Sequence, residues 1–301
     1  MHAKRGAAPA RLRLSVRDAF AALAVVLLWA FNFVAGKVGV SEVPPLFLMT
    51  LRFVLVAALL TPFLRWPRGR GPLVLAISVV LGVCHFGLMF AGLEGVDAGP
   101  AAIAIQLTVP FSAILAAAFY RERLGRWQFV GMVVSFIGIW LLAGAPAERP
   151  DPFHFIMVIA AAFAWAIANV LIKRLGPINV FTLNGWVALL AAPQLLLASL
   201  MVEEGQIAAI ETADWRAWGA VVYMAVCSSI VAYGLWYSLI ERYAINTVVP
   251  MTLLSPVLAV GLAVPFLGEP ITHSLVSGGF LTLTGVAMIQ FLGRPKRVPR
   301  P

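Results

Sequence analysis

The sequence predicts an all-α integral membrane protein with ten transmembrane helices, arranged as two inverted five-helix repeats. Three observations predict this fold class. Of the 301 residues, 61% are hydrophobic and 12% are charged, which is more apolar surface than one soluble domain can bury. Long uncharged runs recur along the chain, and residues of the first half reappear at regular offsets in the second half.

The uncharged runs define the predicted spans, because a helix needs about 20 apolar residues to cross the hydrocarbon and a charge buried there costs several kcal/mol. In the first half of the chain the predicted spans are 19–36, 43–64, 71–93, 98–120 and 127–147. In the second half they are 152–172, 175–202, 217–240, 243–268 and 270–293. The second run contains Arg52, and we still interpret it as a span.

The basic residues predict the orientation of the spans, because cytoplasmic loops retain positive charge. When both termini are placed in the cytoplasm, the 22 Lys and Arg residues fall at cytoplasmic ends and loops, with the exceptions Lys37, Arg52, Arg149 and Arg216. The 13 Asp and Glu residues collect on the opposite side, with the exceptions Asp18, Glu122 and Glu241. Adding or removing one helix would destroy this asymmetry.

The internal duplication is clearest in the later helices of each half. At an offset of about 147 residues, four pairs coincide: Gly87 with Gly234, Glu122 with Glu269, Gly131 with Gly278, and Gly138 with Gly285. Trp29 and Lys37 correspond to Trp165 and Lys173 at a slightly shorter offset. An odd number of spans per copy forces the second copy to enter the membrane from the other side. We therefore predict inverted repeats over 1–148 and 149–301, with a substrate site near the midplane between them.

Short motifs in both halves carry a resemblance to a known family. They are Trp29-Ala30-Phe31-Asn32, Leu51-Arg52-Phe53, Tyr120-Arg121-Glu122-Arg123-Leu124, Trp165-Ala166 and Leu267-Gly268-Glu269-Pro270. With these motifs the chain resembles the ten-helix, EamA-type branch of the drug/metabolite transporter superfamily. Within that branch it is similar to the bacterial exporters of aromatic amino acids. The resemblance implies export of small neutral and aromatic amino acids across the bacterial inner membrane. A multidrug or other metabolite carrier of the same superfamily is the alternative, and a membrane enzyme or a channel ranks below it.

The candidate substrate-binding residues are polar and aromatic side chains in the middle of spans, where each needs a partner or water. A zwitterion with a flat side chain needs both kinds of group. The candidates are Trp29, Asn32, His85, Met89, Gln106, Trp165, Asn169, Tyr233, Tyr237 and Ser255. The alternative interpretation is that the tryptophans lie in the interfacial belt and the amides and histidine join helices.

Other conspicuous residues have simpler interpretations. We expect Arg52 to have a structural role, Lys37 and Lys173 to anchor the ends of their spans, and Glu122 and Glu269 to cap backbone N–H groups. Two rows of small residues let helices approach closely, and we expect them to pack inside each repeat. These rows are Gly131, Ser135 and Gly138, and Gly278, Thr282 and Gly285.

The composition gives no indication of a cofactor or of a macromolecular partner. The two cysteines, Cys84 and Cys227, lie in separate apolar runs without a metal-ligand spacing, so we predict no metal, no cofactor and no catalytic residues. The net charge of +9 comes from short clusters between apolar runs, so we predict no nucleic-acid partner. The expected partners are the small-molecule substrate and membrane lipid, with the protein a monomer or weak homodimer.

Overall fold

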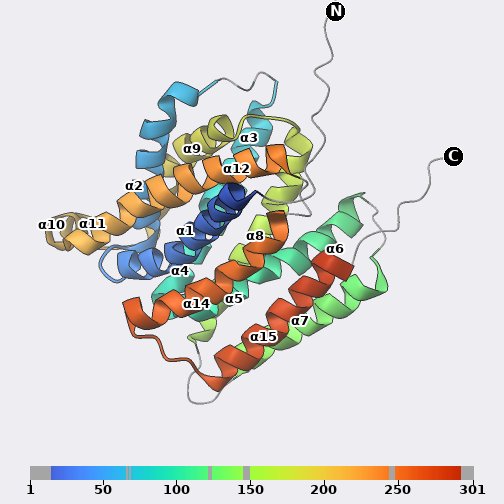
Figure 1. The fold of residues 1–301 in the computed structure, drawn as a ribbon. Helices are drawn as coiled ribbons and strands as arrows, with labels where there is room; N and C mark the ends of the chain where they lie inside the picture. Colours follow the sequence, from blue (N-terminus) through green and yellow to red (C-terminus); the bar gives the residue numbers. More distant parts are fainter. Residues whose placement is uncertain are drawn as a thin grey trace, which may run out of the picture.

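The computed structural model describes residues 15–65, 67, 69–120, 124–144, 150–243 and 248–292, which form helices joined by short connections (Figure 1). Within these ranges, nine helical segments are long and apolar enough to cross a membrane, and a further segment, Met251–Leu267, is apolar but shorter. The all-helical, multi-pass fold class is therefore confirmed. The basic residues before Ser15, the predicted cap Glu122 and the residues after Leu292 lie outside the described residues.

The first half contains five spans, two of which are interrupted by irregular helix. The first, second and fifth spans are α1 (Val16–Val40), α2 (Pro45–Leu60) and α7 (Arg126–Gly144). The third span runs through α3 (Gly71–Ile77), a π-helical segment η2 (Ser78–Gly87) and α4 (Leu88–Gly95). The fourth runs through α5 (Ala98–Ala104), a 3₁₀ segment η3 (Ile105–Leu107) and α6 (Thr108–Tyr120).

The second half repeats this plan, including the irregular segments. The sixth and seventh spans are α8 (Pro152–Leu175) and α9 (Val180–Val202), and a short helix α10 (Gln206–Thr212) follows them. The eighth span is α11 (Trp215–Val222), a π-helical segment η4 (Tyr223–Val231) and α12 (Ala232–Arg242). The ninth contains a 3₁₀ segment η5 (Val249–Leu253) and α14 (Leu254–Leu267), and the tenth is α15 (His273–Ala287) with η6 (Met288–Leu292). A π segment recurs in the third and eighth spans and a 3₁₀ segment in the fourth and ninth, so these spans share one backbone plan in the two halves.

The ends of several helices differ from the predicted spans. The first helix begins at Val16 rather than 19, because the Ser15 side chain caps it by accepting from the Asp18 backbone N–H. The seventh span begins at Val180 rather than 175, because Gly176 adopts φ 75° and a proline follows it. Uncharged runs find the spans but miss these local stop signals.

The two small-residue rows pack against each other, which corrects our expectation that each would pack inside its own repeat. Helices α7 and α15 lie side by side (Figure 1). A Cβ atom added at Gly131 would lie 2.6 Å from the Gly285 carbonyl oxygen, and one at Gly138 would lie 2.6 Å from the Gly278 carbonyl oxygen. Because both copies carry the same small face, that face complements itself across the repeats.

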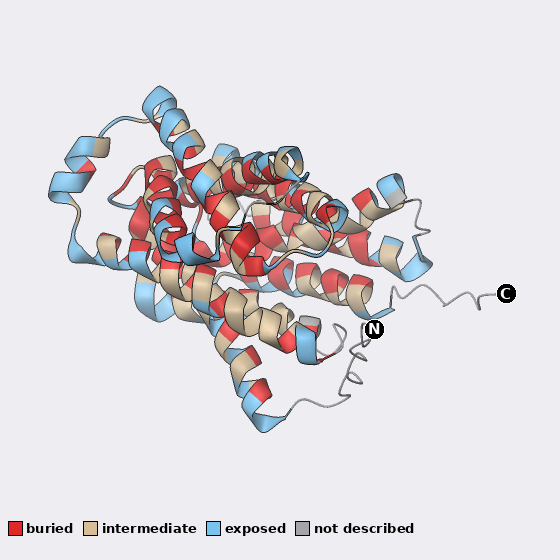
Figure 2. Ribbon diagram, turned by 90° about the horizontal axis from the view of Figure 1, so that it is seen from above, coloured by how far each residue is buried: buried red, intermediate tan, exposed pale blue. Residues whose placement is uncertain are grey.

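Cross-repeat packing extends through the rest of the protein. Helix α1 lies against α12 and α14 of the second half, and α8 lies against α4 and α6 of the first half. Each repeat therefore places its first helix on the third and fourth spans of the other repeat. Buried residues concentrate in the interior and exposed residues at the periphery (Figure 2). Many peripheral side chains are large and apolar, among them Trp140 and Phe280, as a lipid-facing surface requires.

Candidate substrate-binding site

Trp29 on α1 packs against two aromatic residues of α12. Its ring centroid lies 5.5 Å from that of Tyr233, in an edge arrangement, and 5.4 Å from that of Trp236. Tyr233 and Trp236 are three residues apart and therefore share one face of their helix. The first helix of one repeat thus meets the third span of the other through aromatic contacts.

Trp165 makes the equivalent contact in the other repeat. Its ring centroid lies 4.6 Å from that of His85, and His85 lies 4.7 Å from Phe86. His85 is 2% exposed, and its Nδ1 lies 2.9 Å from the Ala161 carbonyl oxygen. Because a carbonyl oxygen only accepts, Nδ1 is the donor, and in the neutral ring Nε2 is left as an acceptor.

Arg52 on α2 connects these two aromatic groups. Its guanidinium carbon lies 4.6 Å from the centre of the Phe86 ring, and its Nη2 donates a 2.9 Å hydrogen bond to the Ser229 hydroxyl. Tyr233 follows Ser229 by four residues in the same span, about one helical turn further on. We call this group of seven side chains the central cluster; it consists of Trp29, Arg52, His85, Phe86, Trp165, Ser229 and Tyr233.

The structure brings together four of the predicted site residues, Trp29, His85, Trp165 and Tyr233. Asn32, Met89, Asn169 and Tyr237 lie elsewhere on the same spans, whereas Gln106 and Ser255 lie on the fourth and ninth spans. Met89 is buried in the apolar core, Asn169 is exposed, and Gln106, Tyr237 and Ser255 are partly buried. Asn32, one turn beyond Trp29, has a buried Oδ1 without a hydrogen-bond partner among the described residues.

The predicted set omits Arg52, Phe86 and Ser229. A signal for Arg52 is present in the sequence, because an ionisable residue inside a span is itself a reason to suspect a functional site. Phe86 carries no such signal, since phenylalanine is common in apolar runs. Ser229 becomes important only through its contact with Arg52, which is 177 residues away in the chain.

We call the side of the bundle on which most Asp and Glu residues lie the acidic side. There, Lys37 and Glu269 form hydrogen bonds with the connection between the third and fourth spans. Lys37 Nζ donates to the carbonyl oxygens of Leu93 at 2.8 Å and Val96 at 2.9 Å. Glu269 accepts from the backbone N–H groups of Ala98 at 2.6 Å and Gly99 at 2.9 Å. Glu269 caps backbone N–H groups as expected, but it caps α5 and not α15, the helix that it precedes in the chain. Burial raises the pKa of Glu269, and the two N–H donors oppose that rise.

Two more carboxylates on this side cap helix N-termini. Glu203, after α9, accepts from the backbone N–H groups of Leu46 and Phe47 at the start of α2. Asp151 accepts from the His154 and Phe153 backbone N–H groups at the start of α8, and these bonds lower its pKa. Negative charge is favourable at helix N-termini, so the acidic residues on this side stabilise the helix ends that lie there.

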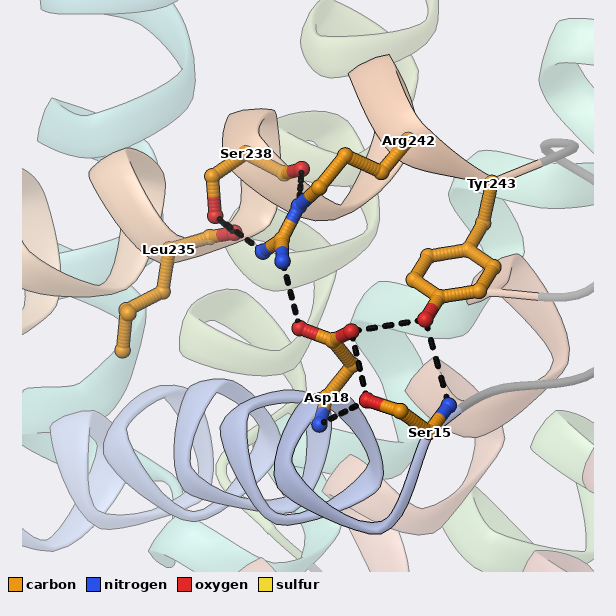
Figure 3. A network of polar contacts seen from close by, with 6 residues as sticks. All are labelled: Ser15, Asp18, Leu235, Ser238, Arg242 and Tyr243. Carbon is orange, nitrogen blue, oxygen red and sulfur yellow. Dashed lines mark hydrogen bonds and ion pairs between the residues drawn. The ribbon is translucent and has the colours of Figure 1, made fainter. Parts of the chain in front are cut away.

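At the opposite end of α1, a polar network joins the first span to the eighth (Figure 3). The Asp18 carboxylate accepts from the Tyr243 hydroxyl at 2.6 Å, the Ser15 hydroxyl at 2.7 Å and Arg242 Nη1 at 2.7 Å. Arg242 also donates to the Ser238 carbonyl oxygen of its own helix. The bonds from Arg242 and Tyr243 therefore join Asp18 to the end of the eighth span, while the bond from Ser15 stays within the N-terminus of α1.

The fold and the central cluster define a class of protein. Two topologically inverted halves, with polar and aromatic groups where they meet inside a helical bundle, are the architecture of a secondary transporter. The EamA-like transporter family matches the chain twice, over residues 17–144 and 153–291, so each half carries one copy of the family unit. The chain belongs to the EamA-like transporter family and is a multi-pass membrane transporter.

Relatives that resemble the chain over its whole length support this assignment. A protein of Salmonella typhimurium named probable amino-acid metabolite efflux pump is 32% identical over 95% of this chain and 99% of its own length. A protein of the same name from Escherichia coli is 31% identical over 91% of this chain and 94% of its own length. A solved crystal structure at 20% identity superposes with a TM-score of 0.63, covering 93% of this chain and 98% of that one, and supports the fold.

Proposed function

We propose that this transporter exports small neutral and aromatic amino acids across the bacterial inner membrane by alternating access, with both termini in the cytoplasm. The observation that carries the proposal is the central cluster. It combines flat aromatic faces with a few hydrogen-bonding groups inside the bundle, which suits a zwitterion with an apolar side chain. The names of the Salmonella and Escherichia coli relatives support the same substrate class.

Cross-repeat packing supports the alternating-access step. One group of helices consists of α1, α12 and α14, and the other consists of α8, α4 and α6. On the acidic side, Lys37 and Glu269 join these groups through the connection between the third and fourth spans. We infer that this face is closed here and that export requires these contacts to break when the substrate leaves.

The test is transport by purified protein in liposomes. The vesicles are loaded with labelled phenylalanine, tryptophan, methionine and threonine, and release is followed with and without a pH gradient. We expect release of at least one of these amino acids above that of protein-free vesicles. If none is moved under either condition, the proposed substrate class is wrong.

A further inference from the structure

Arg52 is a buried cation without an anionic partner among the residues that the structure describes. It is 2% exposed, in the interior of α2. None of the ion pairs formed by the described residues includes it. A guanidinium remains protonated in proteins, and buried charges are normally paired. Within the described part of the chain, therefore, no carboxylate offsets the desolvation cost of this charge.

The N–H donors of the Arg52 guanidinium have only weak or shared acceptors. Nε and Nη2 both point at one neutral acceptor, the Ser229 hydroxyl, at 3.3 and 2.9 Å. Nη1 faces the sulfur of Met49 at 3.9 Å, and a thioether is a weak acceptor. A forked guanidinium matches the two oxygens of a carboxylate much better, because both can be bound at once.

Aromatic rings surround this charge. The guanidinium lies over the Phe86 ring, and the Phe53 and Phe90 rings are also within cation–π range. The Phe86 ring contacts the His85 ring, which in turn contacts Trp165. On the other side, Tyr233 contacts Trp29. A ligand carboxylate at Arg52 would therefore place the rest of the molecule among flat apolar faces.

We propose that Arg52 binds the carboxylate of the transported solute and that Ser229 holds the guanidinium while the site is empty. The proposal rests on the proposed function, which it deepens by assigning the group that selects carboxylate-bearing substrates. Ser229 is suited to this exchange because its hydroxyl also donates to the Met224 carbonyl oxygen at 2.8 Å. It keeps this partner inside η4 when Arg52 turns to a substrate.

The test measures equilibrium binding to the full chain in lipid nanodiscs with three probes. Phenylalanine carries both charges, N-acetylphenylalanine keeps only the carboxylate, and phenylalaninamide keeps only the ammonium. We expect the wild-type protein to bind phenylalaninamide about 10- to 100-fold more weakly than phenylalanine, the range of a charge-assisted, bidentate contact. Equal affinity for these two probes overturns the proposal without any variant.

Variants then test whether Arg52 is the group responsible for the preference for a carboxylate. Arg52→Gln should bind phenylalanine as weakly as phenylalaninamide, and Arg52→Lys should keep part of the preference because it keeps the charge but loses the fork. Arg216→Gln, the matched control, makes the same substitution at an exposed arginine at the start of α11 and should keep the wild-type ratio. If Arg52→Gln keeps the wild-type ratio, Arg52 only joins α2 to η4 and the proposal is wrong.

The same measurements separate this proposal from the proposed function. Binding of phenylalanine without a preference for the carboxylate leaves the amino-acid assignment standing and removes the role of Arg52. Binding of N-acetylphenylalanine but not of phenylalanine, lost in Arg52→Gln, supports Arg52 as the anion-binding group and contradicts the assignment of amino acids as substrates.

Discussion

Ser135 and Thr282 occupy equivalent positions in the two halves and lie against each other, with the Ser135 hydroxyl donating a 3.3 Å hydrogen bond to the Thr282 carbonyl oxygen across 147 residues. The glycines on either side cross over, so that Gly131 meets Gly285 and Gly138 meets Gly278. A pair of helices meets in this way when a twofold axis passes between equivalent residues. The contact between α7 and α15 is thus a local signature of the inverted repeats.

The first prediction concerns this close approach. Gly138→Ala places a Cβ atom against the backbone of α15, which has no room for it, and should lower the free energy of unfolding by about 1–3 kcal/mol. The control is Gly261→Ala in α14, where nothing lies within 4 Å of the added atom. Thermal unfolding of the purified protein in detergent measures both. A Gly138→Ala protein as stable as the control would mean that the two helices do not touch here.

The second prediction concerns orientation. In a background without Cys84 and Cys227, we introduce Arg65→Cys or Glu204→Cys, both at exposed positions between spans. An impermeant thiol reagent added to whole cells should label Glu204→Cys and should reach Arg65→Cys only after the membrane is permeabilised. Labelling of both variants from outside would contradict the proposed placement of the termini in the cytoplasm.

The third prediction concerns the network around Asp18. Asp18→Ala removes the shared acceptor of Ser15, Arg242 and Tyr243 and should lower the unfolding midpoint more than either partner substitution alone. Tyr243→Phe removes two hydrogen bonds, the one that the hydroxyl donates to Asp18 and the one that it accepts from the Ser15 backbone N–H, and should cost about 1–2 kcal/mol. Thermal unfolding of the three single variants, Asp18→Ala, Tyr243→Phe and Arg242→Ala, ranks them. If Arg242→Ala proves the most damaging, the exposed ion pair outweighs the buried hydroxyl contacts.

The fourth prediction concerns pH. Burial raises the pKa of Glu269, so over the window between the ordinary glutamate pKa and this raised value the folded protein holds a proton that the unfolded chain has released. The free energy of unfolding therefore falls as the pH rises through that window. Relative to Glu269→Gln, which cannot titrate, the wild-type protein should gain stability as the pH is lowered through the raised pKa toward the ordinary glutamate pKa. A constant difference between the two proteins would show that Glu269 titrates normally.

A second variant tests the cap itself. Glu269→Ala leaves the N–H groups of Ala98 and Gly99 without their acceptor, and we expect a loss of about 1 kcal/mol at neutral pH.

The sequence predicts the fold class well because two features define it: the long uncharged runs and the distribution of charged residues between them. Both features follow from the membrane environment, which acts on every span in the same way. The repeat offset also predicts that Trp29 and Trp165 have equivalent surroundings, and each indeed contacts the third span of the other repeat.

What the sequence does not predict depends on which helices become neighbours. The rows around Gly131 and Gly278 are equally suited to packing within a repeat or between repeats, and only the assembled bundle decides between these. Arg52 resembles a structural arginine until its surroundings are known to hold Ser229 and aromatic rings instead of a carboxylate. Helix ends such as Val16 and Val180 are determined by caps and glycine, which hydropathy does not register.

The most direct test of the central claim compares phenylalanine transport by Trp29→Ala and Trp165→Ala with that by Trp140→Ala, a control on the exposed face of α7. If the proposed site is right, each cluster variant loses aromatic contact with the substrate, and we expect transport at low substrate concentration to fall by about 10-fold or more while expression and thermal stability are retained. The Trp140→Ala protein should transport like the wild type. Unchanged kinetics in both cluster variants would show that the substrate does not pass between Trp29 and Trp165.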